Sequence, residues 1–210
     1  SDPLAEGPTI QAASYKALEA GMTMHGCIET ARQLRQGGVT VPLVFMGYYN
    51  PVLNYGIEAY TKDCAAAGVD GFIIPDLPVD EAEPFHDACR AVGLALISML
   101  APTSTDDRIA LGVASADGFV YCVSVAGVTG ARSELPLTLP DFVERVRSRT
   151  TLPVAVGFGI SERAHVESVG RVADAAVVGS ALINVIDSAP AGERAERAGA
   201  FIASLVGNGA

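Results

Sequence analysis

Two glycine-containing turns near the C-terminal end of the sequence have the composition of an anion site. Residues 157–161 (Gly-Phe-Gly-Ile-Ser) end one short apolar run, and Gly179 and Ser180 end another. A glycine at the end of a strand lets a backbone N–H approach a ligand closely, because no Cβ stands in the way. A helix pattern follows each turn, and a helix N-terminus adds N–H donors and a partial positive charge. The pair therefore predicts a phosphate site with donors from Gly159, Gly179 and Ser180.

Aromatic and acidic residues stand at the ends of other predicted strands. Tyr48 and Asp76 each follow an apolar run, and Tyr121 lies in a third run. In folds of alternating strands and helices, functional groups gather at the carboxyl ends of the strands. Rings at such places usually pack in the core or at its rim, and an aspartate there is often a solvated turn residue. Beside a phosphate site, the rings favour a substrate with a phosphate tail and a flat ring.

The elements that must position these groups alternate between strands and helices. Short apolar runs bounded by glycine and polar residues are typical of buried parallel strands. Strands are predicted at 41–47, 71–74, 94–100, 118–124, 154–157 and 175–178. Helices are predicted at 9–20, 55–67, 80–92, 139–149 and 190–206; a further helix follows the first and ends at residue 36, and another begins at about residue 107. Residues 48–51 are expected to be a loop, and Asp80 is expected to cap the helix that follows it.

This alternation indicates an α/β fold in a single domain over residues 1–210. Six strands preceded by two helices fit a TIM (β/α)8-barrel with about six of its eight parallel strands present. An open doubly wound sheet fits six strands equally well. In the barrel alternative, we expect an open arc with the runs at 41–47 and 175–182 at its edges. We expect the chain by itself to aggregate, to self-associate through these edges or to stay partly molten.

Composition excludes several classes of function. The net charge of −10 argues against nucleic acid or an anionic membrane surface as a partner. The first residues have neither the basic start nor the apolar middle of a signal peptide. Widely spaced cysteines predict reduced, mostly buried thiols in a cytosol-like compartment and no metal site. The histidines show no ligand spacing and are interpreted as ordinary surface or helix residues. These residues are Cys27, Cys64, Cys89 and Cys122, and His25, His86 and His165.

Five motifs, in order and spread over nearly the whole chain, resemble the tryptophan synthase alpha subunit family. They are 1–11 (SDPLAEGPTIQ), 75–78 (PDLP), 124–130 (SVAGVTG), 157–161 (GFGIS) and 178–181 (VGSA). The resemblance implies an eight-stranded barrel and a lyase that cleaves indole-3-glycerol phosphate by a retro-aldol reaction to indole and glyceraldehyde 3-phosphate. The resemblance further implies that the chain itself binds no cofactor. The partner would be a pyridoxal-phosphate beta subunit in an alpha2-beta2 assembly, in the cytoplasm, with a plastid left open.

The resemblance also assigns roles to individual residues. Glu6 and Tyr121 fall in the catalytic set, with Glu6 as the partner of the indole N–H where the family more often has Asp. Substrate-binding roles fall on Tyr48, Thr129, Gly130, Phe158, Gly159, Gly179 and Ser180, and the beta-subunit interface on Asp2 and Asp76. The family's proton-shuttling glutamate would precede Ser1, so we expect impaired turnover from the 210-residue chain alone.

Two alternatives compete with this interpretation. The first is a different phosphate-binding barrel enzyme, which would need a catalytic Lys, Cys or His at a strand end. The lysines of the sequence, Lys16 and Lys62, both fall in predicted helices, which weakens this alternative. The second is a catalytically inactive fragment that retains the phosphate-binding and beta-subunit-binding surfaces. Indole release by the chain would discriminate between an enzyme and such a fragment.

Overall fold

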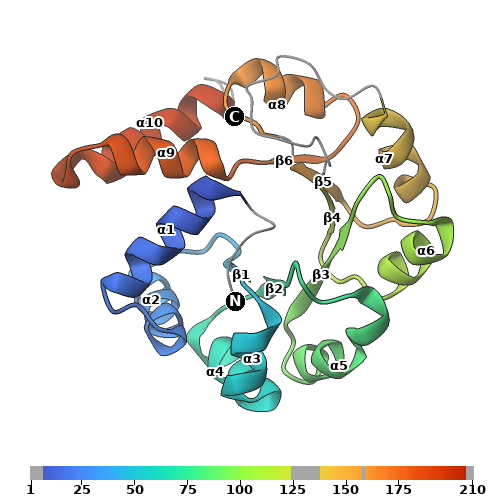
Figure 1. Ribbon diagram of the computed structural model, residues 1–210, viewed down its shortest axis with the longest axis horizontal. Helices are drawn as coiled ribbons and strands as arrows, with labels where there is room; N and C mark the ends of the chain where they lie inside the picture. The colour runs from blue at the N-terminus through green and yellow to red at the C-terminus, as the bar shows by residue number, and fades with distance from the viewer. Residues whose placement is uncertain (1–6, 124–137, 158, 207–210) are drawn as a thin grey trace.

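Six parallel strands, hydrogen-bonded in the order in which they occur along the chain, form one curled sheet in the computed structural model. The structure describes residues 7–123, 138–157 and 159–206. The strands are β1 (Val44–Met46), β2 (Gly71–Ile73), β3 (Ala95–Leu100), β4 (Val120–Val123), β5 (Val154–Gly157) and β6 (Ala175–Val177). Figure 1 shows them along the inner side of an arc, with helices on its outer side.

Helices separate the strands along the chain. They are α1 (Pro8–Glu19), α2 (Met24–Gln36), α3 (Tyr49–Tyr55), α4 (Ile57–Ala67), α5 (Glu83–Ala91), α6 (Asp106–Ala114), α7 (Leu139–Arg147), α8 (Arg163–Val169), α9 (Ser180–Ser188) and α10 (Arg194–Val206), with short 3₁₀ helices at Val79–Glu81 and Ala191–Glu193. Within the described ranges, no helix is long and apolar enough to cross a membrane.

The strand order decides between the two folds left open by the sequence. A doubly wound sheet reverses its strand order at a switch point. Here the order runs from β1 to β6 without reversal, and every neighbouring pair is parallel. The predicted arc of six strands, with the runs at 41–47 and 175–182 at its edges, is therefore confirmed.

The expected loop at residues 48–51 was wrong, because helix α3 begins at Tyr49. The side chain of its N-cap residue, Tyr48, does not cap the helix. Instead, the backbone N–H of Tyr49 donates to Oδ1 of Asp76 at 2.9 Å, from the loop after β2. A cap supplied by a distant segment satisfies the helix start as well as a local one, but it leaves no mark in the local sequence.

The expected cap by Asp80 was also wrong. Asp80 lies in a 3₁₀ helix, and its Oδ1 accepts a hydrogen bond from Arg108 of α6 at 3.0 Å. Helix α5 begins later, at Glu83, with Pro84 in its first turn. The fixed φ of proline suits that position, and its missing N–H removes one donor that would need a cap. Helix α6 has a local cap, since the Thr105 side chain accepts a hydrogen bond from the Arg108 N–H.

Apolar side chains cover both faces of the sheet. On the outer face they pack against the helices, and Phe72, Phe85, Val154 and Val156 are fully buried there. On the inner face a smaller cluster forms around Ile73, Ile97 and Tyr121, with partly buried neighbours. Because successive strand residues point to opposite faces, the continuous apolar runs of the sequence supply both clusters.

Aspartates in the loops before β2 and β6 fix the amino edge of the sheet. Asp70 accepts the backbone N–H of Leu43 at 2.6 Å, and Asp174 accepts that of Val154 at 2.8 Å. Arg147 of α7 lies 2.6 Å from Asp174. The Val154 N–H, together with Arg147, lowers the pKa of the Asp174 carboxyl below its ordinary value. Each carboxylate therefore ties one strand to the loop before the next.

Strands β1 and β6 are the edges of the arc, and each has a sheet neighbour on one side. Met46, at the end of β1, is 45% exposed. Helix α1 lies beside α9, where Lys16 forms an ion pair with Asp187. No residue of α1 is buried. A row of unpaired N–H and C=O groups along an edge strand is a template for pairing with another chain.

The 210-residue chain is therefore expected to self-associate through these edges. Met46→Lys places a charge at the β1 edge and should reduce the associated fraction in sedimentation velocity at equal protein concentration. Leu53→Lys is the matched control, because Leu53 is similarly exposed, at 51%, but lies on helix α3 and not on an edge strand. A well-folded monomer, or equal effects of the two lysines, would contradict edge pairing.

Candidate functional site

The inner face of β4 and β5 brings Tyr121 against Gly157. Tyr121 is 9% exposed, and its ring crosses from β4 toward the carboxyl end of β5. A Cβ at Gly157 would lie 2.3 Å from the hydroxyl oxygen of Tyr121 and 2.7 Å from its Cε2. The space above Gly157 is thus filled by the tyrosine ring, which ends at the edge where the predicted site residues gather.

The two glycine turns stand at matching heights on neighbouring strands. Gly157 of β5 pairs with Val177 of β6, so Gly159 and Gly179 each lie two residues beyond a paired position. Gly159 has a φ of +42°, a left-handed conformation that glycine adopts without steric cost. Gly179 is exposed, and the atom nearest to a Cβ built on it is Ile10 Cδ1 at 4.0 Å. Among the described residues, none comes within 4 Å of a Cβ at Gly159 and only Ile10 reaches that distance at Gly179, so a ligand could approach both backbones.

Helix α9 adds its N-terminus to this edge. It begins at Ser180, and the N–H groups of Leu182 and Ile183 already donate to the carbonyl of Gly179. Within the described residues, no side chain caps the helix start. The N–H groups of Ser180 and Ala181 belong to the first turn, which has no intrahelical partner. Together with the positive end of the helix dipole, they make this edge suited to a phosphate.

Tyr48 and Asp76 lie at the other end of the arc, after β1 and β2. They are brought together indirectly, because Asp76 caps the helix whose N-cap residue is Tyr48. Asp76 is exposed. Its carboxylate therefore has a structural role that a solvated turn residue lacks, since it fixes the start of α3 beside Tyr48.

The other site residues named from the sequence lie outside the described residues. These are Asp2, Glu6, Thr129, Gly130 and Phe158. Their assignments stay predictions that rest on the resemblance.

All three histidines lie on helices, as the sequence interpretation allowed, but two of them are buried and hydrogen-bonded rather than featureless. His86 is 7% exposed, and its Nε2 lies 2.8 Å from Oδ2 of Asp117. His165 is 3% exposed and bonds the loop that contains Gly159. Buried polar groups need hydrogen-bond partners, and both rings find theirs on a neighbouring segment. Each histidine thus ties a helix to a loop.

The cysteines are unsuited to nucleophilic chemistry. Cys64, Cys89 and Cys122 are buried, and burial raises the pKa of each thiol to about 12. A thiol that keeps its proton at neutral pH is neither a strong nucleophile nor a good metal ligand. The exposed Cys27 does not match the expected burial, but its pKa is also raised by burial of the sulfur.

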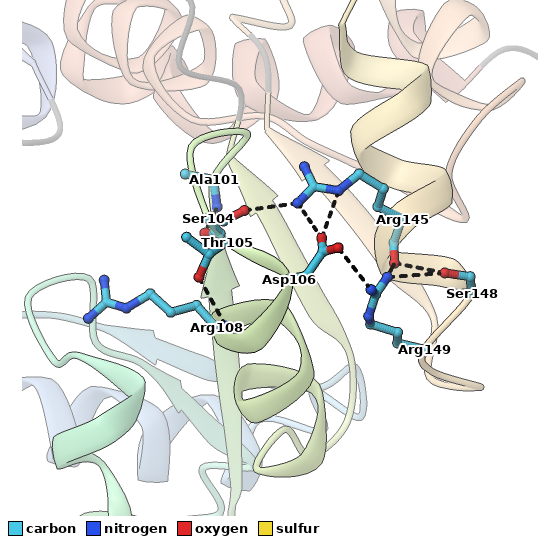
Figure 2. A network of polar contacts seen from close by, with 8 residues as sticks. All are labelled: Ala101, Ser104, Thr105, Asp106, Arg108, Arg145, Ser148 and Arg149. Atoms are coloured by element: carbon cyan, nitrogen blue, oxygen red, sulfur yellow. Dashed lines mark hydrogen bonds and ion pairs between the residues drawn. The ribbon is translucent and has the colours of Figure 1, made fainter.

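A connected group of charges lies between α6 and α7 (Figure 2). Asp106 accepts hydrogen bonds from Arg145 at 2.6 and 3.2 Å, and Arg149 lies 3.3 Å from its other oxygen. The Arg145 hydrogen bond, with the charge of Arg149, lowers the pKa of the Asp106 carboxyl. Arg145 also donates to the carbonyl of Ser104, in the loop after β3. Both guanidinium groups are engaged with a carboxylate, so this cluster joins two helices.

Sequence reasoning missed two residues of this site, Gly157 and His165. Gly157 stood inside a recognised motif, but its packing partner, Tyr121, is 36 positions away in the sequence. His165 could have been found from its spacing. It lies four residues before Val169, and residues i and i+4 share one helix face. A histidine on the same face as an apolar residue, just after a glycine turn, indicates burial against that turn.

Three comparisons agree on the relatives of this chain. A family model described as tryptophan synthase alpha chain matches residues 1–204. The tryptophan synthase alpha chain of Roseiflexus sp. (strain RS-1) is 58% identical over 207 residues, which are 99% of this chain and 79% of that protein. The corresponding protein of Chloroflexus aggregans is 51% identical over 206 residues, covering 98% of this chain and 77% of the relative.

A solved structure shares the fold. In the tryptophan synthase a2b2 complex from Pyrococcus furiosus, the matching chain is 37% identical and has a TM-score of 0.91. The match covers 98% of this chain and 83% of that one. Sequence and structure therefore point to the same relatives over the same residues.

Proposed function

This chain belongs to the tryptophan synthase alpha chain family, and on that premise we propose that the carboxyl edge of its sheet binds and cleaves indole-3-glycerol phosphate. The family is one of lyases, and its alpha subunit catalyses the cleavage of this substrate in tryptophan biosynthesis. The observation that carries the assignment of the site is the pair of glycine turns at matching heights on β5 and β6, beside the start of α9.

The phosphate end of the substrate is proposed to lie against Gly159, Gly179 and Ser180. Backbone N–H groups are suited to this role because they point at the anion and need no reorganisation when it binds. The ring of Tyr121, which lies on the inner face of the same strands, would then border the indole. Tyr48 and Phe158 are proposed to line the ring pocket, and Thr129 and Gly130 to contact the substrate from the segment after β4.

The chemical step is a retro-aldol cleavage, and Glu6 is proposed to act in it. As C3 of the indole gains a proton and a glycerol hydroxyl loses one, positive charge builds on the ring. A carboxylate at the indole N–H stabilises that charge in the transition state. The proton transfers themselves need a second carboxylate acting as general acid and base, which the resemblance places before Ser1.

The partner is proposed to be a tryptophan synthase beta subunit, with Asp2 and Asp76 at the interface. The supporting observation is that solved relatives of this fold come from a tryptophan synthase a2b2 complex. On this proposal the chain holds no cofactor, because pyridoxal phosphate belongs to the beta subunit, and the assembly is a cytoplasmic alpha2-beta2 heterotetramer.

The phosphate site can be tested with Gly179→Asp. A carboxylate here would reach the donors of α9 and repel an anion. Two like charges about 5 Å apart at an effective dielectric constant of about 20 repel by roughly 3 kcal/mol, a loss of about a hundredfold in affinity. Equilibrium dialysis of inorganic phosphate with the wild type and the variant measures the effect, and thermal unfolding should change little because the Cβ has room.

Gly179→Asn is the matched control, because it has the same shape without the charge. We expect it to bind phosphate more weakly than the wild type but clearly more tightly than the aspartate variant. Equal binding by the wild type and the aspartate variant would place the phosphate elsewhere.

A further inference from the structure

His165 forms a hydrogen bond that the reaction proposed above does not use. It lies on α8, immediately after the turn that contains Gly159, and its side chain is 4% exposed. Its Nδ1 accepts the backbone N–H of Ser161 at 3.3 Å. The imidazole of His165 on α8 is therefore bonded to the backbone of the proposed phosphate turn.

This hydrogen bond defines the state of the ring. A nitrogen that accepts an N–H carries no proton, so the neutral ring has its proton on Nε2. Nε2 is buried and makes no hydrogen bond within the described residues, although Oε1 of Glu162 lies 3.2 Å away. The ring thus turns its acceptor toward the turn and its N–H toward the start of α8.

The phosphate turn is held on both sides of Gly159. Before it, Gly157 is paired with Val177 in the sheet. After it, Ile160 is 2% exposed in the outer apolar cluster, and Ser161 is bonded to His165. The direction of the Gly159 N–H therefore depends on where Ile160 and Ser161 are fixed, and His165 supplies the polar part of that fixation.

We propose that His165 is a positioning residue for the phosphate turn, which it holds in place through the Ser161 N–H. This inference rests on the proposed phosphate site at Gly159, Gly179 and Ser180. An apolar residue at this position would fill the same space, but it would leave Ser161 without its acceptor. Because Ser161 is exposed, its N–H could then bond water, so the turn would lose order at little cost in stability.

Two substitutions separate the acceptor from the bulk of the ring. His165→Phe keeps a planar ring and removes the acceptor, although its ring is larger. If the phenylalanine variant unfolds at a lower temperature than the wild type, His165→Leu serves as the apolar variant instead. His165→Asn is smaller, but its Oδ1 can stand where Nδ1 stands. Inorganic phosphate is titrated by equilibrium dialysis, and the exchange rate of the Ser161 amide proton is measured in each protein.

We expect His165→Phe to weaken phosphate binding about tenfold and to speed exchange of the Ser161 amide, while His165→Asn stays within about threefold of the wild type. Phosphate binding by His165→Phe at wild-type strength would overturn the positioning role. Equal losses of phosphate affinity in His165→Phe and His165→Asn would also overturn the positioning role, because the effect would then follow from packing. Absence of phosphate binding by the wild type itself would remove the phosphate site, and this inference with it.

Discussion

Gly157→Ala is expected to destabilise the fold by about 1–3 kcal/mol, the usual cost of forcing an extra carbon into a packed site. The new Cβ would lie 2.3, 2.7 and 2.9 Å from three atoms of the Tyr121 side chain, closer than real contacts allow. Tyr121 is 9% exposed in the inner cluster, so its ring has little room to move. Either the ring leaves the site or β5 shifts against β6.

Either displacement, of the Tyr121 ring or of β5, should reduce turnover, because a displacement of about 1 Å at a site can cost roughly a hundredfold in rate. Activity is measured as indole release by a completed chain, a chimera in which the Roseiflexus relative supplies the parts that this chain does not cover. Denaturant unfolding of the same protein gives the loss of stability.

Gly199→Ala is the control for the glycine substitution itself. It lies in α10, where nothing stands within 4 Å of the new Cβ, so it should leave the fold as stable or slightly more stable. If the clash causes the loss, Gly157→Ala should cost much less in a Tyr121→Ala background, a coupling that a double-mutant cycle measures. Full additivity of the two substitutions would contradict the contact.

Glu6→Gln is expected to lower kcat for indole release by roughly 10²–10⁴-fold, the range found when one electrostatic or acid–base group is removed. The amide keeps the size of the side chain but loses the negative charge that the developing ring cation needs. Phosphate binding should change little, because the donors proposed at Gly159, Gly179 and Ser180 remain. The completed chain is assayed for kcat with indole-3-glycerol phosphate and dialysed against inorganic phosphate.

Glu19→Gln is the matched control, since it makes the same chemical change at an exposed position at the end of α1. Its turnover should equal that of the wild type. Unchanged kcat in Glu6→Gln would remove this residue from the mechanism, and a parallel loss of phosphate binding would make its role structural.

The order of strands and helices could be predicted from the sequence because buried parallel strands and amphipathic helices leave local patterns. The apolar runs placed all six described strands, and the glycines that end the runs of β5 and β6 marked the edge where the candidate site lies. Motifs in the chain indicated the family for the same reason, since a backbone turn that binds phosphate needs particular residues side by side.

Contacts between distant segments were decided only by the tertiary structure. Asp76 caps α3 from another loop, Tyr121 fills the space above Gly157, and His165 bonds the turn after Gly159 across the start of a helix. Each depends on how the sheet curls and which loops it brings together. A side chain's partner across such a distance is set by packing, so local sequence determines where these residues stand along the chain and the fold determines what they touch.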